Sequence, residues 1–263
     1  MLLALHQLSC IYAARERSFH GGCRHKRAIL WTHLSLVKTI PPAQHRPGKP
    51  GCHTPSPKPE ASPIYPMRNL ILASSSSYRR ALLERLTVPF ECAAPHINEE
   101  ALPGEDAEAL ARRLATEKAA ALRKQFPDSL IIGSDQVAEC DGRLLGKPGS
   151  AAKAREQLQF CAGKAVHFHT GLSIYDTKTG FQVTECERYS VYFRALSNRE
   201  IARYIELDNP LDCAGSFKAE GLGIALFEKM EGSDPNILIG LPLIRLISML
   251  AQFDISPLDP SQS

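Results

Sequence analysis

The sequence of 263 residues contains no long hydrophobic run, and no stretch approaches the roughly 18 consecutive apolar residues that indicate a membrane-spanning helix. The sequence therefore predicts a protein without a membrane partner. Its eight cysteines include no Cys-x-x-Cys pair, the spacing that is typical of zinc sites and redox motifs. Cysteines scattered in this way favour reduced thiols in a cytoplasmic protein over a disulfide framework.

Three common catalytic or nucleotide-binding motifs are also absent. The sequence has no Gly-x-x-x-x-Gly-Lys-Ser/Thr, no Gly-x-Gly-x-x-Gly that opens a helix and no His-Glu-x-x-His. These absences exclude a P-loop protein, a dinucleotide-binding Rossmann protein and a zinc protease of the common type. A nucleotide or metal site in this chain must therefore be built from other residues.

Charge and proline are unevenly distributed along the chain. Residues 1–66 contain nine of the 19 prolines and carry nine Lys or Arg against two Glu, whereas residues 67–263 carry 22 Lys or Arg against 26 Asp or Glu. Because the first region lacks apolar periodicity, we expect a disordered extension or a true start at Met67. The folded domain should span 67–255. Its mildly acidic balance predicts no nucleic-acid partner, and a nucleic-acid-binding arm at 1–66 is the alternative.

The most informative stretch covers residues 70–80. Its first three residues, Leu-Ile-Leu, form an apolar run typical of a buried strand, and four serines then lead into an amphipathic helix. Hydroxyls, free backbone N–H groups and the positive end of a helix dipole meet at such a turn and favour an anion. Arg79 and Arg80 add planar guanidinium groups suited to phosphate oxygens. The alternative is an ordinary helix start with solvated arginines.

Apolar periodicity along the rest of the chain predicts alternating strands and helices, and hence an α/β fold. The strongest helix covers 106–123, with Asp106 near its start. The other expected elements are strands at 88–94, 129–133, 165–175, 181–193 and 222–227, and helices at 151–161, 197–206 and 238–250.

Acidic and basic residues occur in the loops at the expected strand ends, where open α/β sheets bind ligands. Carboxylates commonly hold Mg²⁺ or Mn²⁺ together with water and phosphate oxygens, and lysines or arginines neutralise a departing phosphate. Individual residues of this set also have ordinary interpretations. Asp135 is then a turn residue, Lys147 a solvated lysine and Lys118 half of a surface ion pair. The set comprises Glu99, Asp135, Glu220, Arg79, Arg80, Lys118 and Lys147.

Four short motifs, in this order and spacing, are more specific together than singly. They are Leu72-Ala73-Ser74 with Arg79-Arg80, Gly133-Ser134-Asp135-Gln136, Gly146-Lys147-Pro148 and Gly221-Leu222-Gly223-Ile224. The combination resembles the Maf-like nucleoside triphosphate pyrophosphatase family over about 68–250. The segment from Cys213 to Gly221 and the aromatic Tyr78 are similar to its 7-methyl-GTP pyrophosphatase subgroup, rather than to the subgroup that acts on dTTP and UTP.

The resemblance implies a mixed twisted sheet with flanking helices, in two lobes around a central cleft. It also implies a nucleotide substrate, 7-methyl-GTP above all, and hydrolysis of the bond between the α and β phosphates with Mg²⁺ or Mn²⁺ as cofactor. A non-catalytic nucleotide-binding regulator and the pyrophosphatase acting on dTTP or UTP are the alternatives. A homodimer is left open.

The resemblance also assigns roles to individual residues. Asp135 matches the proton acceptor. Glu99 matches a polar position of the cleft, and because carboxylates commonly hold divalent cations, Glu99 with Asp135 is our candidate for holding the metal. Because 7-methylguanine is cationic, an aromatic face and a carboxylate are suitable receptors for the base. The implied specificity residues are Tyr78, Gln136 and Glu220. The implied phosphate-binding residues are Ser74, Arg79, Arg80, Lys118 and Lys147.

Overall fold

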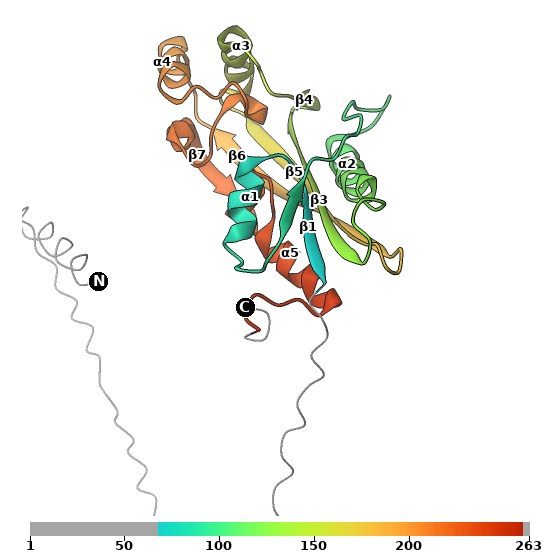
Figure 1. Cartoon of the computed structure of the whole chain (residues 1–263). Helices are drawn as coiled ribbons and strands as arrows, with labels where there is room; N and C mark the ends of the chain where they lie inside the picture. Colours follow the sequence, from blue (N-terminus) through green and yellow to red (C-terminus); the bar gives the residue numbers. More distant parts are fainter. Residues whose placement is uncertain (1–67, 260–263) are drawn as a thin grey trace, which may run out of the picture. The chain divides into compact units, whose positions relative to one another are not determined.

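The computed structural model describes residues 68–259, so the expectations for residues 1–66 lie outside the described residues. In the described range the chain forms a mixed sheet of seven strands with helices on both faces (Figure 1). Among the described helices, none combines the length and hydropathy that a membrane span requires. The expected α/β architecture is confirmed.

The sheet combines parallel and antiparallel pairing. Its strands are β1 (Asn69–Ala73), β2 (Glu91–Ala93), β3 (Ser129–Cys140), β4 (Arg143–Leu145), β5 (Ala165–Asp176), β6 (Gln182–Phe193) and β7 (Phe227–Glu231). The order across the sheet is β2-β1-β3-β5-β6-β7, with β4 paired to β3. β1 is parallel to β2 and β3, whereas β5, β6 and β7 continue in antiparallel fashion. The strand β3 is therefore the junction between the two patterns.

Helices cover both faces of the sheet. The α-helices are α1 (Ser77–Glu84), α2 (Ala107–Ala121), α3 (Ala151–Cys161), α4 (Asn198–Asp208) and α5 (Leu243–Leu250). The 3₁₀ helices are η1 (Ala214–Ser216), η2 (Leu222–Leu226), η3 (Pro235–Ile239) and η4 (Ala251–Phe253). Side chains alternate along a strand, so Leu70 and Leu72 of β1 pack against α1 and α5, whereas Ile71 and Ala73 pack on the α2 side. The sheet is thus buried between two helical layers.

A second lobe forms where β3, β5 and β6 extend beyond β1. There α3 and α4 lie side by side, at the top of Figure 1. Their apolar residues share one core with Phe168 of β5, Phe193 of β6 and Phe217. Phe217 contacts both of the other rings edge-on, with centroids 5.3 and 5.8 Å apart. The expected two-lobed arrangement is present, and the long strands connect the lobes.

Several element boundaries follow directly from capping residues. Ser76, Asp106, Ser150 and Ser197 each accept a hydrogen bond from a backbone N–H in the first turn of α1, α2, α3 and α4, respectively. Such caps satisfy N–H groups that have no partner inside the helix. The helix at 151–161 and the hairpin formed by β5 and β6 match the sequence-based expectation closely.

Three expectations need correction. The strand expected to end at Gly133 continues to Cys140, because β5 stays paired with it from Leu130 to Glu139. The strand expected at 222–227 is mostly the 3₁₀ helix η2, and β7 begins only at its last residue. The helix expected at 238–250 begins at Leu243, since a left-handed Gly240 (φ 103°) and Pro242 separate η3 from α5.

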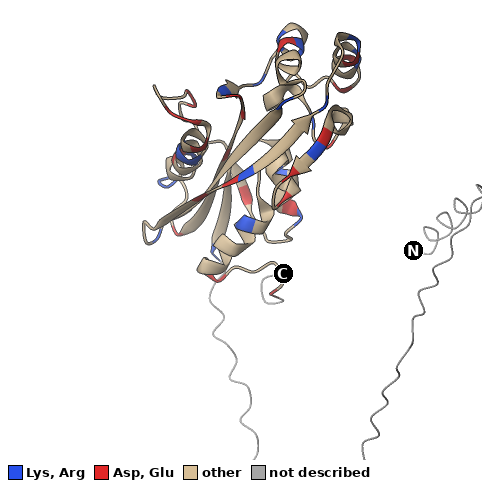
Figure 2. Cartoon of the chain, turned by 180° about the vertical axis from the view of Figure 1, so that it is seen from behind, with Lys and Arg blue, Asp and Glu red and all other residues tan. Residues whose placement is uncertain are grey.

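Charged side chains of both signs are distributed over the helices and strands. Figure 2 shows the basic and acidic segments interspersed along the ribbon. Oppositely charged groups form many of the surface contacts, including the pairs Arg112–Glu108 and Arg203–Glu206. Side chains of both signs are thus interspersed over the described residues, and the absence of a nucleic-acid partner stays a prediction.

Candidate active site

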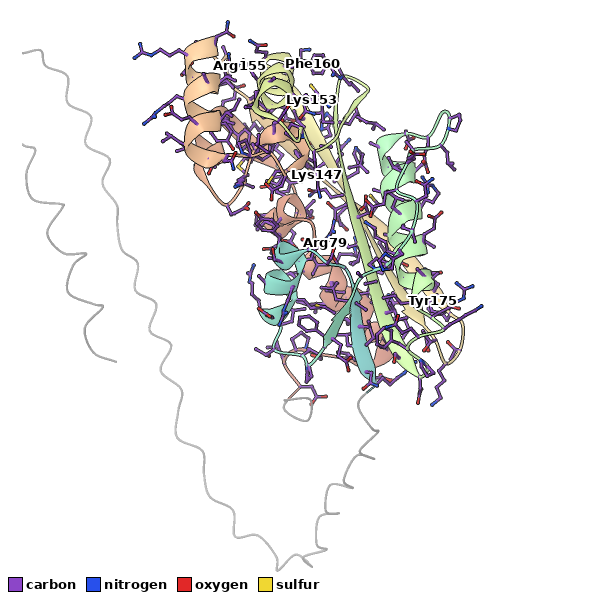
Figure 3. All side chains as sticks on the ribbon, turned by 45° about the horizontal axis from the view of Figure 1, so that its top comes forward. Arg79, Lys147, Lys153, Arg155, Phe160 and Tyr175 are labelled. Carbon is purple, nitrogen blue, oxygen red and sulfur yellow. The ribbon has the colours of Figure 1, made fainter. Side chains whose placement is uncertain are left out.

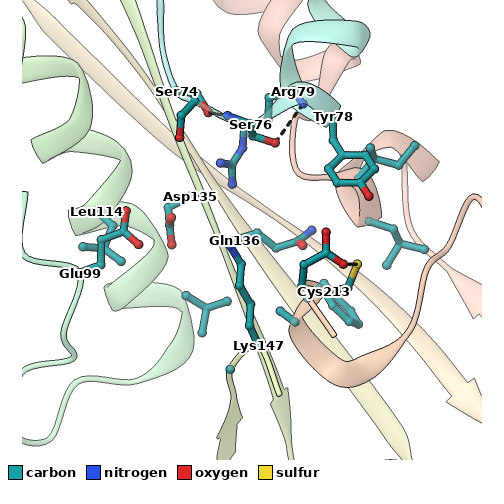
Figure 4. A pocket seen from close by; sticks show the side chains of 18 of the residues that line it. Ser74, Ser76, Tyr78, Arg79, Glu99, Leu114, Asp135, Gln136, Lys147 and Cys213 are labelled. Atoms are coloured by element: carbon teal, nitrogen blue, oxygen red, sulfur yellow. Dashed lines mark hydrogen bonds between the residues drawn. The ribbon is translucent and has the colours of Figure 1, made fainter. Parts of the chain in front are cut away.

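A cavity of about 700 Å³ lies at the carboxyl end of β1, where the β1–α1 loop meets β3, β4 and the segment before η2. Figure 4 shows Glu99 and Asp135 on one side and Tyr78 and Cys213 on the other, with Arg79 between them. Segments that are far apart in the sequence therefore line one cavity. The residues predicted from the sequence that line it are Ser74, Tyr78, Arg79, Glu99, Lys118, Asp135, Gln136, Lys147 and Glu220.

Arg80 is the predicted site residue that the structure does not bring to this cavity. Its Nε lies 3.0 Å from Oε1 of Glu84, and 65% of the side chain is exposed. Successive helix residues point about 100° apart, so α1 can aim only one of its two arginines at the cavity. Arg79 is the residue that faces inward (Figure 4).

The serine-rich loop closes the turn from β1 into α1. The Oγ of Ser74 accepts a hydrogen bond from the N–H of Ser76 at 3.1 Å, and the Oγ of Ser76 accepts one from the N–H of Arg79 at 3.4 Å. Ser75 and Ser77 also line the cavity. The predicted turn from a strand into a helix is present, and a helix N-terminus with hydroxyls around it is suited to anionic oxygens; anion binding here stays a prediction.

Lys118 lies between two carboxylates. Its Nζ is 2.6 Å from Oδ1 of Asp135 and 2.7 Å from Oε1 of Glu99. Lys118 and Asp135 are buried, whereas more than half of the Glu99 side chain is exposed. The helix α2 can bring Lys118 this close because β3 has Gly133 beneath it: a Cβ there would lie 2.2 Å from the Ala115 carbonyl oxygen. The alternative of a surface pair for Lys118 is wrong.

Opposite charges in the cavity shift the pKa values of Glu99 and Arg79. Burial works to raise the pKa of Glu99, but the hydrogen bond and charge of Lys118, with the charges of Lys147 and Arg79, outweigh it and lower the pKa. Burial lowers the pKa of Arg79, and the charges of Asp135 and Glu99 oppose that effect. A guanidinium keeps its proton at any physiological pH, so both groups are charged.

The carbonyl oxygen of Gly240 connects Arg79 to β3. It accepts a hydrogen bond from Arg79 Nε at 2.8 Å, and the Ser134 hydroxyl lies 3.0 Å from the same oxygen. That hydroxyl is also 2.9 Å from the Gly171 carbonyl oxygen of β5. Arg79 is therefore held by the chain just before α5, with part of its guanidinium left free to face the cavity.

Gln136 is fixed in a similar way. Its Nε2 donates hydrogen bonds to the Ile237 carbonyl and, at 3.3 Å, to Thr170 Oγ1. Thr170 also donates to the Ile237 carbonyl, at 3.2 Å. Because the amide nitrogen is engaged by the protein, the side-chain oxygen of Gln136 is the atom left to accept a hydrogen bond from a ligand.

The opposite wall of the cavity is aromatic and acidic. Tyr78 contributes a partly exposed ring, and Asp212, Cys213 and Glu220 come from the segment around η1. Burial, with the charge of Asp212 next, raises the pKa of Tyr78, and burial raises that of Cys213 to about 12. Both groups are therefore protonated at neutral pH.

Lys147 reaches the cavity from the loop after β4. Figure 3 places Lys147 and Arg79 in the middle of the molecule, between α3, with Lys153 and Arg155, and the end of β5 at Tyr175. Among the described residues, no carboxylate forms an ion pair with Lys147. Its ammonium is exposed and available to a ligand.

Two carboxylates of the cavity have the character of metal ligands. Within the described residues, no three His, Cys, Asp or Glu side chains form a cluster that could hold a metal by itself. Mg²⁺ and Mn²⁺ in phosphate sites commonly use only one or two carboxylates, with water and substrate oxygens completing the shell. Glu99 and Asp135, which contact the same ammonium, fit that requirement.

The fold and the cavity define an α/β protein whose cleft carries cationic side chains, a buried carboxylate and an aromatic wall. The chain belongs to the Maf family, since the family model described as "Maf-like protein" matches residues 69–253. The resemblance deduced from the four sequence motifs is thereby confirmed.

Curated relatives and solved structures are also similar to the chain. It is 54% identical over 192 residues to "7-methyl-GTP pyrophosphatase" of Chromohalobacter salexigens, a match covering 73% of this chain and 100% of the relative. It is 53% identical over 193 residues to the protein of the same name from Pseudoalteromonas atlantica, covering 73% and 99%. The Ham1 protein of Staphylococcus aureus has a solved structure that matches 72% of this chain and 100% of its own at 14% identity, with a TM-score of 0.42, too low to carry an argument.

Sequence reasoning left three features of the site without a role. Asp212 begins the polar, small-residue-rich segment 212–221, which the sequence indicates as a binding loop, but the sequence assigns Asp212 no role of its own. Ser134 belongs to a recognised motif, but only the three-dimensional structure shows it beside Gly240. A glycine followed closely by a proline at 240–242 could have indicated the break before α5.

Proposed function

We propose that this protein is a nucleoside triphosphate pyrophosphatase that hydrolyses the α–β phosphate bond of 7-methyl-GTP, giving 7-methyl-GMP and pyrophosphate. The observation that carries the proposal is one cavity in which the buried Asp135, in contact with Lys118, faces an aromatic and acidic wall at Tyr78. Membership of the Maf family and two relatives named 7-methyl-GTP pyrophosphatase at more than 50% identity support it.

In this proposal Asp135 accepts a proton from the water that attacks the α-phosphorus. Lys118 donates a hydrogen bond to Oδ1 of Asp135 and so fixes the plane of the carboxylate. Among the described residues Oδ2 has no hydrogen-bond donor of its own, which leaves it for water. A positioned carboxylate of this kind contributes on the order of 10²–10⁴-fold to the rate.

The triphosphate binds where cations and N–H groups converge. Arg79 is held by the Gly240 carbonyl, Lys147 forms no ion pair within the described part of the chain, and the serine loop presents the N-terminus of α1. Fixed positive groups stabilise the charge that develops on the departing pyrophosphate. The exposed Arg80 would act on the triphosphate only through its long-range charge.

Glu99 and Asp135 would hold the divalent metal, Mg²⁺ or Mn²⁺. The metal supplies further positive charge beside the phosphates when it is bound. Lys118 contacts both carboxylates in the structure described here, and so keeps their oxygens close together. The low pKa of Glu99 keeps that carboxylate ionised and ready for a cation.

The base occupies the opposite wall, against Tyr78. The aromatic face offers a cation–π contact to the positively charged ring of 7-methylguanine. Glu220 is exposed into the cavity and can accept hydrogen bonds from the N–H groups of guanine. Gln136 offers its side-chain oxygen, because its amide nitrogen is tied to the Ile237 carbonyl.

The test is pyrophosphate release from a panel of 7-methyl-GTP, GTP, dTTP and UTP, with Mg²⁺ or Mn²⁺ added. We expect kcat/KM to be highest for 7-methyl-GTP and the Asp135→Asn variant to lose about 10²–10⁴-fold of kcat, because an amide keeps the shape but accepts no proton. A panel without turnover would indicate a nucleotide-binding regulator instead. Wild-type turnover by folded Asp135→Asn would remove Asp135 as the proton acceptor.

A further inference from the structure

The acidic wall of the cavity contains two carboxylates that have no cationic partner in the part of the chain that the structure describes. Asp212 and Glu220 both line the cavity and both are exposed. Among the described residues, no Lys, Arg or His forms an ion pair with either of them, and the neighbouring Lys218 is not among the residues that line the cavity. The catalytic side differs, because Lys118 neutralises Asp135 and Glu99 there. The cavity thus has a cationic side and a separate, uncompensated anionic side.

Asp212 lies on the same wall of the cavity as Tyr78, and both residues line it. After burial, the charge of Asp212 is the largest contributor to the raised pKa of Tyr78, ahead of Cys213 and of Glu220, while Lys218 acts in the opposite direction. Because Asp212 lines the same cavity and forms no ion pair among the described residues, a cation stacked on the Tyr78 ring would lie near an unpaired carboxylate. A neutral ring in the same place gains little from the charge of that carboxylate.

The loop that carries Asp212 is held in place. The Cys213 thiol donates to Oδ1 of Asp212 at 3.4 Å. Farther along, the N–H of Lys218 donates to the Tyr204 hydroxyl of α4 at 3.0 Å, and Phe217 is buried in the core of the second lobe. A carboxylate on an anchored loop loses little freedom when a ligand binds, so more of its attraction appears as affinity.

We propose that Asp212 is a specificity-determining residue that selects nucleotides with a positively charged base. Its carboxylate attracts the delocalised charge of an N-alkylated purine stacked on Tyr78, while Glu220 and Gln136 contact hydrogen-bonding groups common to the charged and the neutral base. The inference rests on the proposed function for the nature of the ligand. It adds that charge on the base, rather than the methyl group as such, is what the cavity recognises.

The experiment measures binding rather than turnover, so that it remains informative if the proposed hydrolysis fails. The Kd values of 7-methyl-GMP and GMP are determined by calorimetry for wild type, Asp212→Asn and Asp212→Glu. The matched control is Glu228→Gln, which removes the same charge from an exposed residue that does not line the cavity.

We expect wild type to bind 7-methyl-GMP more tightly than GMP, and Asp212→Asn to reduce that preference by about three- to tenfold, since the carboxylate is exposed and partly screened. Asp212→Glu and the control should keep most of the preference, and raising the salt concentration should weaken it in wild type. An unchanged ratio of Kd values in Asp212→Asn, or no preference in wild type, would overturn the inference. Hydrolysis of the triphosphate panel is measured in a separate experiment. Its result tests the proposed function and does not bear on the role of Asp212.

Discussion

At the scale of single residues, the central feature of the site is the ammonium of Lys118, which contacts two carboxylates at once. This ammonium is buried and contacts Asp135 and Glu99 at similar distances, so neither carboxylate is left without a cation. Asp135 has little exposure to water of its own. Removing one partner from a buried pair leaves an uncompensated charge, which costs more than the pair itself contributes.

We therefore expect Lys118→Met to lower both stability and activity. The free energy of unfolding should fall by about 3 kcal/mol, because Asp135 then remains buried and negatively charged. Chemical denaturation of wild type and variant measures the change. The double variant Lys118→Met with Asp135→Asn should regain most of the stability, yet stay inactive. Equal unfolding midpoints for wild type and Lys118→Met would contradict the role given to Lys118.

At the scale of elements, α2 packs unusually close to the sheet, and two glycines make this approach feasible. A Cβ on Gly171 of β5 would lie 2.1 Å from the Ala111 carbonyl oxygen, and Gly133 of β3 has a similar clash with Ala115. Because both obstacles are helix backbone, side-chain rotation cannot relieve them. The close approach is also what lets Lys118 reach Asp135.

Gly171→Ala should consequently displace α2 and destabilise the protein by about 3 kcal/mol or more, as expected for overpacking against backbone. Thermal and chemical unfolding measure the loss, and activity should fall with it, since Lys118 moves with the helix. The matched control is Gly146→Ala, where an added Cβ meets nothing within 4 Å. A Gly171→Ala protein as stable as this control would show that α2 can shift at no cost.

A second element-scale feature is the attachment of the loop that carries Glu99 to α2. Arg113 donates to Glu105 at 2.7 Å and to the Glu100 carbonyl at 2.9 Å, and Glu105 also accepts the N–H of Leu102. The hydrogen bond from Arg113, followed by that from Leu102, lowers the pKa of Glu105 to about 2. This clamp fixes one end of the loop beside the site.

The shifted pKa of Glu105 predicts a pH dependence. In the folded state Glu105 binds its proton only near pH 2, against about 4.5 ordinarily, so its stabilising effect is fully present above pH 4.5 and is lost as the pH falls towards 2. Between pH 6 and pH 2, the free energy of unfolding should therefore change less with pH for Glu105→Gln than for wild type. Identical slopes would contradict the shift.

At the scale of the whole molecule, the sequence predicted the α/β class, the hairpin and most helices because caps and apolar periodicity are local signals. The sequence-based prediction was wrong where a boundary depends on pairing with a distant strand. The strand β3 continues beyond Gly133 because β5, some 30 residues later, pairs with it. For the site, too, the local sequence signals were more informative than the contacts between distant segments. Nine predicted residues line the cavity, whereas Arg80 points away, and only the folded chain shows that Asp212 lies on the same wall as Tyr78.

The family match covers residues 69–253, and all of the sequence motifs of the site lie after Met67. We propose that this part of the chain is sufficient for folding and for hydrolysis. A protein that begins at Met67 should match the full chain in unfolding midpoint and in kcat/KM for 7-methyl-GTP. Loss of either property on deletion of residues 1–66 would show that the preceding segment contributes to the folded body.

The continuous pairing of β3 with β5 also has a mechanical consequence. The ladder runs without interruption from the pair Leu130–Asp176 to the pair Glu139–His167, and so passes through both lobes. Bending the lobes apart would break a series of backbone hydrogen bonds at once. We therefore expect the two lobes to move little relative to each other when a nucleotide binds, and the association rate to respond to ionic strength rather than to an opening of the lobes.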